Sequence, residues 1–320
     1  MYAEHSPNHR PRALLFLPEG IAREWLPAFT SPEFPAKVSL HRIGDDPDPD
    51  TRYALGIPRQ DQLLKMPKLR AVFALSAGVD QMLVDGWKVD APLVRLSHPS
   101  VAQQLASYCV MRALGHLRNT VELDARQRNR IWSQNEPGMR TADTSVGILG
   151  MGASGSLIAD TLRNLGMRVV GWTRSGRRIG GIPTECGSEG LLKLLSSSGI
   201  MICTLPLTDE TRGILDREAI GAMKFGCYFI NVGWGKIVDE AALVQALQER
   251  RLSGAALDVF ATEPLPPENP LWTLGGVSIT AHHAAIIAPQ DAADAIAKGM
   301  ADDIAGRLPP DDVVSPERGY

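Results

Sequence analysis

Three glycines lie between a short apolar run and a helix-compatible stretch, in a pattern typical of dinucleotide binding. The apolar run, Val146 to Leu149, leads directly into Gly150, Gly152 and Gly155, and the helix-compatible stretch runs from Ser154 to Leu165. In a strand–turn–helix unit the first glycine permits the turn, the second admits a pyrophosphate to the backbone, and the third lets helix and strand pack closely. The N–H groups of the helix N-terminus then face the phosphates. The predicted contacts are Gly150, Gly152, Ala153, Ser154 and Gly155; the alternative is a glycine-rich turn without a ligand.

The residues after the next apolar strand, "MRVVGW", indicate which dinucleotide binds. A site for NAD usually has an aspartate or glutamate there to bind the ribose hydroxyls. This chain instead has "TRSGRR", residues 173–178, without a carboxylate and with arginines at 174, 177 and 178. Guanidinium groups bind phosphate well, so we predict NADP(H) in preference to NAD(H), contacted by Thr173, Arg174 and Ser175. The alternative is a basic surface loop beside an NAD site that lacks its acid.

A tryptophan between two glycines, in "NVGWGKIVDEAALVQAL", raises a separate question. The segment is predicted to be the end of a buried strand, a turn and an amphipathic helix. Glycines usually permit a tight turn or the close approach of a ligand. Trp234 is the largest side chain that could stand between Gly233 and Gly235, so its presence there needs a reason.

Length, charge and cysteine usage restrict the class of protein. The chain has 320 residues, a net charge of −3, 44% hydrophobic and 22% charged residues, which favours a globular protein of two domains. This charge gives no indication of nucleic acid or an anionic membrane as a partner. Its four cysteines are widely spaced, which argues against zinc and disulfides and favours a cytoplasmic protein; we predict no metal site. The polar start "MYAEHSPNHRPR" lacks the apolar region of a signal peptide.

The elements expected from periodicity define an α/β protein with two parallel sheets. Short apolar runs such as "ALLFL", "RYALGI" and "LRAVFAL" alternate with helix-compatible stretches. Residues 99–132 have helical periodicity without a break, which predicts one long helix, and a final helix is expected over 286–308. We predict a substrate domain of residues 1–98 and 287–320, with a cofactor domain of residues 99–286 inserted into it.

Several stretches, in order and spacing, resemble the D-isomer-specific 2-hydroxyacid dehydrogenases. They are "LSAGVDQML", "VGILGMGASG", "CTLPLTDETRGIL", "INVGWGKIVDEAALVQAL", "GAALDVFATEPLPPENPLW" and "ITAHHAA". The branch that looks most similar is that of the bacterial glyoxylate/hydroxypyruvate reductases, which favour NADPH. This resemblance implies a flavodoxin-like substrate domain, a Rossmann-type cofactor domain and a homodimer formed through the latter, with the long helix and "IWSQNEPGMR" as the contact region. The expected partners are a small-molecule substrate and a second copy of the chain.

The resemblance also implies roles for individual residues. His282 matches the family's catalytic acid–base, and Glu263 matches the glutamate that pairs with it. Asp258 matches a residue that contacts the nicotinamide carboxamide. The backbone of Ala77, Gly78 and Val79 matches the loop that holds a substrate carboxylate. Further cofactor contacts are expected from Leu205, Pro206, Thr211, Val232, Gly233 and His282.

Departures from the family pattern concentrate at substrate-side positions. Trp234 stands where the family has an arginine that clamps the substrate carboxylate and polarises the reacting carbonyl, and an indole has one N–H donor and no charge. Ala281 replaces the usual proline, and His98 and Ser107 stand where the reductases usually have carboxylates. Arg59, in "GIPRQ", occupies a substrate-side loop. We therefore predict a pocket that includes Trp234, Arg59 and His98 and accepts an altered substrate.

Two other hypotheses fit the same sequence. The chain could be an ordinary glyoxylate/hydroxypyruvate reductase in which Arg59 replaces the missing clamp. Alternatively, it could bind NADP(H) without turnover, as a sensor or partner-binding module. The retained His282 and Glu263 argue against the second of these.

Overall fold

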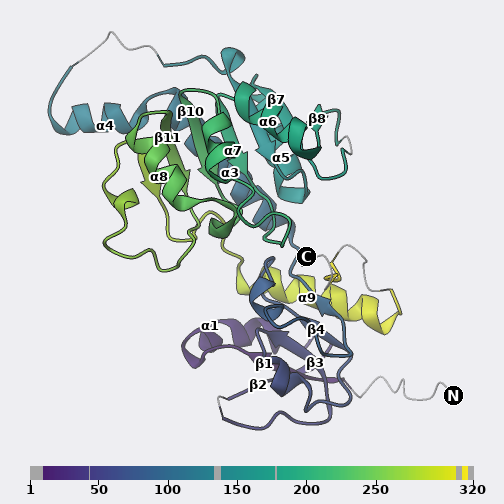
Figure 1. Cartoon of the computed structure of the whole chain (residues 1–320). Coiled ribbons are helices and arrows are strands. Elements are labelled where there is room, and N and C mark those ends of the chain that lie inside the picture. The colour runs from purple at the N-terminus through teal and green to yellow at the C-terminus, as the bar shows by residue number, and fades with distance from the viewer. Residues whose placement is uncertain (1–9, 43, 133–137, 177–178, 308–311, 316–320) are drawn as a thin grey trace. The chain divides into compact units, whose positions relative to one another are not determined.

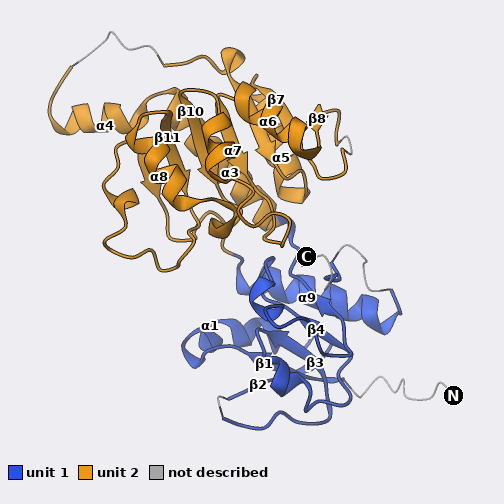
Figure 2. Cartoon of the chain, viewed as in Figure 1, with its two compact units in different colours: residues 1–99, 287–320 blue, residues 100–286 orange. Residues whose placement is uncertain are grey.

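The computed structural model describes residues 10–42, 44–132, 138–176, 179–307 and 312–315. The chain divides into two compact units, Met1–Pro99 with Ile287–Tyr320 and Ser100–Ile286 (Figure 2). The second unit therefore interrupts the first in sequence. The prediction of an α/β protein with two parallel sheets is confirmed. None of the helices in the described ranges combines the length and apolarity needed to span a membrane.

The first unit is a five-stranded parallel sheet between two layers of helix and loop. Its strand order is β2-β1-β3-β4-β5, with bounds β1 Arg12–Phe16, β2 Lys37–Leu40, β3 Thr51–Gly56, β4 Ala71–Phe73 and β5 Leu93–Val94. Helices α1 (Glu19–Phe29) and α9 (Pro289–Ile304) pack on the face that carries Ala13 and Leu15 (Figure 1). On the other face, Leu14 and Phe16 form a core with residues of α2 (Gln60–Leu63) and of the 3₁₀ turn η1 (Asp80–Met82).

The second unit is a seven-stranded parallel sheet with helices on both faces (Figure 1). The order is β12-β11-β10-β9-β6-β7-β8, with bounds β6 Ser145–Leu149, β7 Arg168–Trp172, β8 Thr184–Glu185, β9 Ile200–Cys203, β10 Cys227–Asn231, β11 Leu252–Leu257 and β12 Val277–Ile279. Helices α3 (Pro99–Leu117) and α5 (Ala153–Asn164) share one core, while α6 (Gly187–Ser197), α7 (Arg217–Ala222) and α8 (Glu240–Gln248) share the other. Short 3₁₀ turns are η2 Thr141–Asp143, η3 Gly235–Ile237 and η4 Pro270–Trp272.

The single long helix predicted for residues 99–132 is wrong. Helix α3 ends at Leu117, and α4 (Thr120–Arg128) starts after Asn119, whose φ is +52°. A left-handed residue cannot continue a right-handed helix, and asparagine tolerates that conformation better than most residues. The sequence pattern does not reveal this break because α4 has no buried residue. The spacing of its apolar residues therefore does not indicate the direction of the helix axis. Residues 133–137 of the predicted dimer loop lie outside the described residues.

Candidate functional site

The glycine loop after β6 has the shape that its sequence requires. Gly150 has a φ of +95°. A Cβ at Gly155 would lie 1.9 Å from the carbonyl oxygen of Gly150, so only glycine permits this contact between helix and loop. A Cβ at Gly152 would meet no atom within 4 Å, and no side chain caps the helix that starts at Ala153. The loop thus combines free space with uncapped N–H groups, which fits a pyrophosphate.

The strands on either side of β6 end at the same level of the sheet. Leu149 pairs with Trp172 of β7 and with Cys203 of β9. The hydroxyl of Thr204 donates to the carbonyl oxygen of Gly150 over 2.8 Å, which ties the loop after β9 to the glycine loop. Thr211 donates to the carbonyl oxygen of Pro206 over 2.6 Å and fixes the turn that follows Leu205. The predicted contacts Leu205, Pro206 and Thr211 therefore lie on a loop beside the glycines.

Two described residues after β7 have properties relevant to a 2′-phosphate. The hydroxyl oxygen of Thr173 is buried and has no hydrogen-bond partner among the described residues. The guanidinium of Arg174 pairs with the Glu210 carboxylate over 3.0 Å, and Ser175 is exposed. Arg177 and Arg178 lie outside the described residues. Thr173 and Arg174 offer a hydroxyl and a cation to a phosphate, while Glu210 faces the same cation.

The Trp234 loop answers the question that its glycines raise. A Cβ at Gly233 would lie 2.9 Å from the Leu205 carbonyl oxygen, and one at Gly235 would lie 1.8 Å from the carbonyl carbon of Phe260. The glycines therefore let the loop pack against the backbone of two neighbouring loops; they do not make room for the indole. The buried Asn231 side chain closes the turn, donating to the Trp234 carbonyl oxygen over 3.2 Å and accepting from the Gly233 N–H over 3.1 Å. Val232, also predicted to contact the cofactor, is buried in this turn.

His282 and Glu263 form the predicted pair. Their Nδ1 and Oε2 atoms are 2.9 Å apart, and the second carboxylate oxygen of Glu263 accepts from the Phe260 N–H over 3.0 Å. His282 has a φ of +57°, an unusual conformation for a residue other than glycine. The Trp234 ring meets the imidazole edge-on, with ring centroids 6.3 Å apart and an interplanar angle of 85°. Trp234 thus lies beside the imidazole that the sequence singled out.

Asp258 anchors the loop that carries His282. Its side chain, in a residue only 2% exposed, accepts from the Thr280 hydroxyl over 2.5 Å and from the N–H groups of His283 and Ala284 over 2.8 and 3.0 Å. Its own carbonyl oxygen accepts from the His282 N–H over 2.9 Å. Tyr108 of α3 lies 2.8 Å from the Thr280 hydroxyl oxygen and donates to it, because the threonine hydrogen is directed at Asp258. These bonds hold His282 in its left-handed conformation.

Sequence reasoning did not single out Asn231, Thr280 or Tyr108 as side chains that shape the site. Asn231 is the last residue of β10 and Thr280 follows β12, and each is close in sequence to a predicted site residue, which is a local signal. Tyr108 had no local signal, since it lies 172 positions from Thr280 in sequence.

The predicted residues of the first unit divide into a loop and two ion pairs. The N–H groups of Ala77, Gly78 and Val79 make no hydrogen bond to the described residues, whereas the Gly78 carbonyl oxygen accepts from Ser76 over 2.6 Å. Free backbone N–H groups are suitable for binding a carboxylate. The His98 imidazole lies 3.6 Å from the Asp291 carboxylate.

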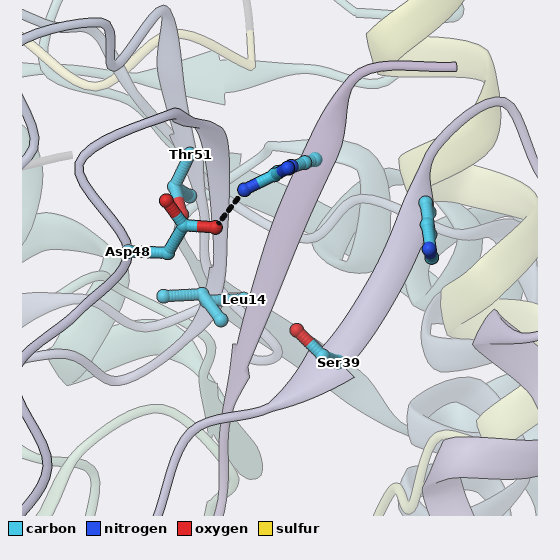
Figure 3. A pocket seen from close by; sticks show the side chains of 6 residues that line it. Leu14, Ser39, Asp48 and Thr51 are labelled. Atoms are coloured by element: carbon cyan, nitrogen blue, oxygen red, sulfur yellow. Dashed lines mark hydrogen bonds and ion pairs between the residues drawn. The ribbon is translucent and has the colours of Figure 1, made fainter. Parts of the chain in front are cut away.

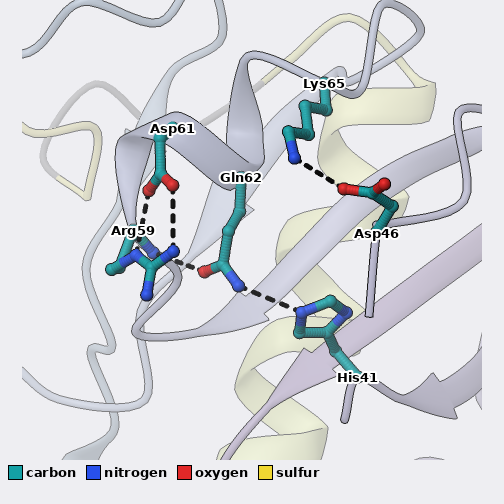
Figure 4. A network of polar contacts seen from close by, with 6 residues as sticks. All are labelled: His41, Asp46, Arg59, Asp61, Gln62 and Lys65. Atoms are coloured by element: carbon teal, nitrogen blue, oxygen red, sulfur yellow. Dashed lines mark hydrogen bonds and ion pairs between the residues drawn. The ribbon is translucent and has the colours of Figure 1, made fainter. Parts of the chain in front are cut away.

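The Arg59 guanidinium is paired with a carboxylate in its own loop. Its Nε and Nη2 atoms lie 3.0 and 2.9 Å from the two oxygens of Asp61 (Figure 4). The Arg59 backbone N–H donates to Gln62 over 3.0 Å, and Gln62 in turn lies 3.0 Å from the buried His41. Arg59 therefore helps to start helix α2, and its charge is balanced locally.

In the first unit, a polar cavity of about 200 Å³ lies at the amino ends of strands β1 and β2 of the five-stranded sheet (Figure 3). It is lined by Arg12, Leu14, Lys37, Ser39, Asp48 and Thr51. The Arg12 guanidinium is held 2.5 Å from the Asp48 carboxylate. The loop of Ala77 to Val79 follows the carboxyl end of β4 instead, so this cavity is separate from the predicted substrate residues.

Comparisons with known proteins show which family this chain belongs to. The family model for the NAD-binding domain of D-isomer specific 2-hydroxyacid dehydrogenases matches residues 110–284. Glyoxylate/hydroxypyruvate reductase A of Serratia proteamaculans is 36% identical over 295 residues, covering 90% of this chain and 93% of that protein. The corresponding reductase of Yersinia enterocolitica is 33% identical, covering 93% and 96%.

Solved structures show the same similarity. A D-isomer specific 2-hydroxyacid dehydrogenase from Xanthobacter autotrophicus, in complex with NADPH and MES, is 36% identical with a TM-score of 0.89, covering 96% of this chain and 99% of that one. An NADPH-dependent glyoxylate/hydroxypyruvate reductase from Sinorhizobium meliloti, with NADP and sulfate, is 30% identical with a TM-score of 0.86, covering 97% and 100%.

Proposed function

Because this chain belongs to the D-isomer specific 2-hydroxyacid dehydrogenase family, we propose that it is an NADP(H)-dependent oxidoreductase that interconverts a hydroxy and a keto compound. The observation that carries this proposal is the contact of 2.9 Å between His282 and Glu263, in the unit that also holds the glycine loop. The first unit, residues 1–99 with 287–320, would hold the substrate, and the second, residues 100–286, would hold the cofactor.

His282 is the proposed acid–base. Its Nδ1 faces Glu263, so Nε2 is left to give a proton to the carbonyl oxygen during reduction, or to take one during oxidation. Glu263 orients the ring through this contact. Asp258 acts through the backbone of the loop and keeps the imidazole in place, in addition to its expected contact with the carboxamide. The nicotinamide, when bound, supplies or accepts the hydride.

The residues after β7 support the proposed preference for NADP(H) over NAD(H). NADP(H) is favoured because Arg174 and the Thr173 hydroxyl, which has no partner among the described residues, suit a 2′-phosphate, and no carboxylate follows the strand directly. The NADP(H)-bound relatives support the same preference. Gly150, Gly152, Ala153, Ser154 and Gly155 would hold the pyrophosphate. Ser175, Leu205, Pro206, Thr211, Val232 and Gly233 would line the remainder of the dinucleotide site.

Trp234 is the reason to propose an altered substrate. Its ring lies beside His282, where an arginine would otherwise clamp a carboxylate, and it brings an apolar surface without charge. A substrate that is larger or less charged than glyoxylate fits such a wall better. The N–H groups of Ala77, Gly78 and Val79, which have no hydrogen-bond partner among the described residues, are suitable for an anionic or carbonyl oxygen.

A second candidate function is ordinary glyoxylate/hydroxypyruvate reduction, which the names of the curated relatives favour. It requires another cation to replace the clamp. Arg59 was the candidate for this role, but its guanidinium is already bound to Asp61 in a two-point contact. A non-catalytic NADP(H)-binding role remains the third alternative, and the intact pair of His282 and Glu263 argues against it.

A homodimer in the cytoplasm completes the proposal. Large apolar side chains are exposed on and after α3 and α4, at Met111, Val121, Leu123, Ile131 and Trp132, and Trp132 is 87% exposed. A second copy of the chain could cover them.

The state of the cysteines is compatible with the proposed cytoplasmic location. The four cysteines are free, and burial raises the pKa of Cys203 and Cys227 to about 12, which leaves these thiols unreactive.

The test is NADPH oxidation by the purified protein with glyoxylate, hydroxypyruvate and a panel of bulkier 2-keto acids, ketones and aldehydes, alongside NADPH titration by fluorescence. Turnover of a bulkier carbonyl compound in preference to glyoxylate is the expected result. Rapid glyoxylate reduction would favour the ordinary reductase. NADPH binding without turnover across the panel would favour the non-catalytic alternative.

A further inference from the structure

We infer that Glu210 weakens the binding of 2′-phosphorylated dinucleotide by competing for Arg174, and that it thereby sets the balance between NADP(H) and NAD(H). This inference rests on the proposed cofactor site. The observation behind it is the contact of 3.0 Å between Arg174 Nη1 and Glu210 Oε2, which joins residues 36 positions apart.

The position of this ion pair in the sheet gives it a role in the cofactor site. Arg174 stands two residues after β7, and Glu210 stands on the loop after β9. In the sheet, β7 and β9 are the two neighbours of β6, whose end carries the glycine loop. The ion pair therefore joins the two loops that leave the sheet on either side of the predicted pyrophosphate site.

The loop that carries Glu210 is well fixed. Thr211 accepts from the Thr208 N–H over 2.8 Å and donates to the Pro206 carbonyl oxygen over 2.6 Å. The Arg212 N–H donates to the Thr208 carbonyl oxygen over 2.9 Å. A carboxylate on such a turn keeps its place when the cofactor arrives, so its charge remains near Arg174.

The charges determine the direction of the effect. A 2′-phosphate bound by Arg174 would carry between one and two negative charges close to the Glu210 carboxylate, and like charges at that range repel. NAD(H) has hydroxyls instead of the phosphate at the ribose and would experience almost none of this repulsion. Glu210 therefore acts against NADP(H) selectively, and Arg174 would exchange Glu210 for the phosphate when NADP(H) binds.

Exposure limits the size of the effect. The side chains of Arg174 and Glu210 are 49% and 67% exposed, so solvent and salt screen the interaction. We expect Glu210→Gln to lower the Kd for NADPH by roughly three- to tenfold at low ionic strength and to leave the Kd for NADH unchanged. The gain should shrink as salt is added.

Asp209 provides a matched control. It precedes Glu210 on the same loop, is exposed, and forms no ion pair with the described residues. Asp209→Asn makes the same change in net charge and should leave the ratio of the two dissociation constants as it is. Arg174→Ala should weaken NADPH binding and abolish the effect of adding Glu210→Gln.

The experiment is fluorescence titration of the full-length wild type and these variants with NADPH and NADH, with unfolding temperatures as a check on folding. A gain for NADPH alone in Glu210→Gln, absent in Asp209→Asn and in the Arg174→Ala background, supports the inference. An equal change for both cofactors, or weaker NADPH binding, overturns it while the proposed function stands. Failure of the wild type to bind either cofactor would overturn both.

Discussion

The two sides of the Trp234–His282 contact differ in how closely they match the roles that the family resemblance implies. On the histidine side, Glu263 binds the imidazole and Asp258 anchors its loop through three side-chain hydrogen bonds. On the tryptophan side, the loop is equally well held, by Asn231, yet it presents an apolar ring where a cation is expected. The proposed acid–base pair and the proposed substrate wall are therefore held by separate sets of hydrogen bonds.

The difference shows that loop geometry and side-chain chemistry are separate constraints. Gly233 and Gly235 are required because backbone atoms of Leu205 and Phe260 lie too close for a Cβ. That requirement is independent of residue 234, whose side chain projects toward His282. A substitution at 234 can thus change the surface beside His282 while it leaves the positions of the neighbouring loops intact.

The largest expected effect is that of removing the His282 imidazole. His282→Gln removes the proton donor and should lower kcat by about 10²- to 10⁴-fold with any substrate that the wild type turns over. NADPH affinity, measured by fluorescence, should fall far less than kcat, because His282 is one expected cofactor contact among many and the glycine loop is untouched. Activity within tenfold of wild type would contradict the assignment of His282 as the acid–base.

The next largest effect is expected from replacing Trp234 by arginine. Trp234→Arg restores a cation beside His282 and should raise kcat/KM for glyoxylate by roughly 10²-fold, because charge developing on the reacting oxygen is again stabilised. Activity toward the preferred bulkier substrate should fall. Trp234→Gln is the control, since it removes the ring without adding a cation. An equal gain in both variants would show that the ring merely blocks access.

A smaller effect tests whether Arg59 has taken over the clamp. Asp61 already neutralises this guanidinium, so Arg59→Ala should change KM by less than about threefold. Asp61→Asn, which releases Arg59, provides the complementary variant. A large rise in KM for Arg59→Ala, together with a fall for Asp61→Asn, would identify Arg59 as the replacement clamp and favour the ordinary reductase.

The smallest effect concerns His116, which takes no part in the Trp234–His282 contact. His116 of α3 stacks on Tyr228 with ring centroids 4.2 Å apart, and burial lowers its pKa. The unfolded chain then binds a proton that the folded chain resists, so stability should fall as pH drops below the ordinary histidine pKa of about 6.5. His116→Phe should flatten the decline in unfolding temperature between about pH 7 and pH 5. If unfolding temperature declines with pH in His116→Phe as it does in the wild type, His116 does not cause the decline.

The predictions from sequence were most accurate where they depended on residues close together in the chain. The glycine spacing predicted the loop after β6, and Gly150 and Gly155 have the conformation and contact that the pattern requires. The pairing of His282 with Glu263 came from resemblance, and the structure brings the two side chains within 2.9 Å. The long helix of residues 99–132 failed because one left-handed residue, Asn119, interrupts it.

Local patterns in the chain specify the class of fold, the glycine loop and the residues available for chemistry, because alternating apolar runs and glycine spacing act over a few neighbouring residues. The pairs of side chains that meet depend on the folding of distant segments onto one another. Tyr108 reaches Thr280 across 172 positions, Arg174 reaches Glu210 across 36, and Arg59 is bound by Asp61. Such contacts depend on how strands align in a sheet and how loops leave it, and these are properties that no local pattern encodes.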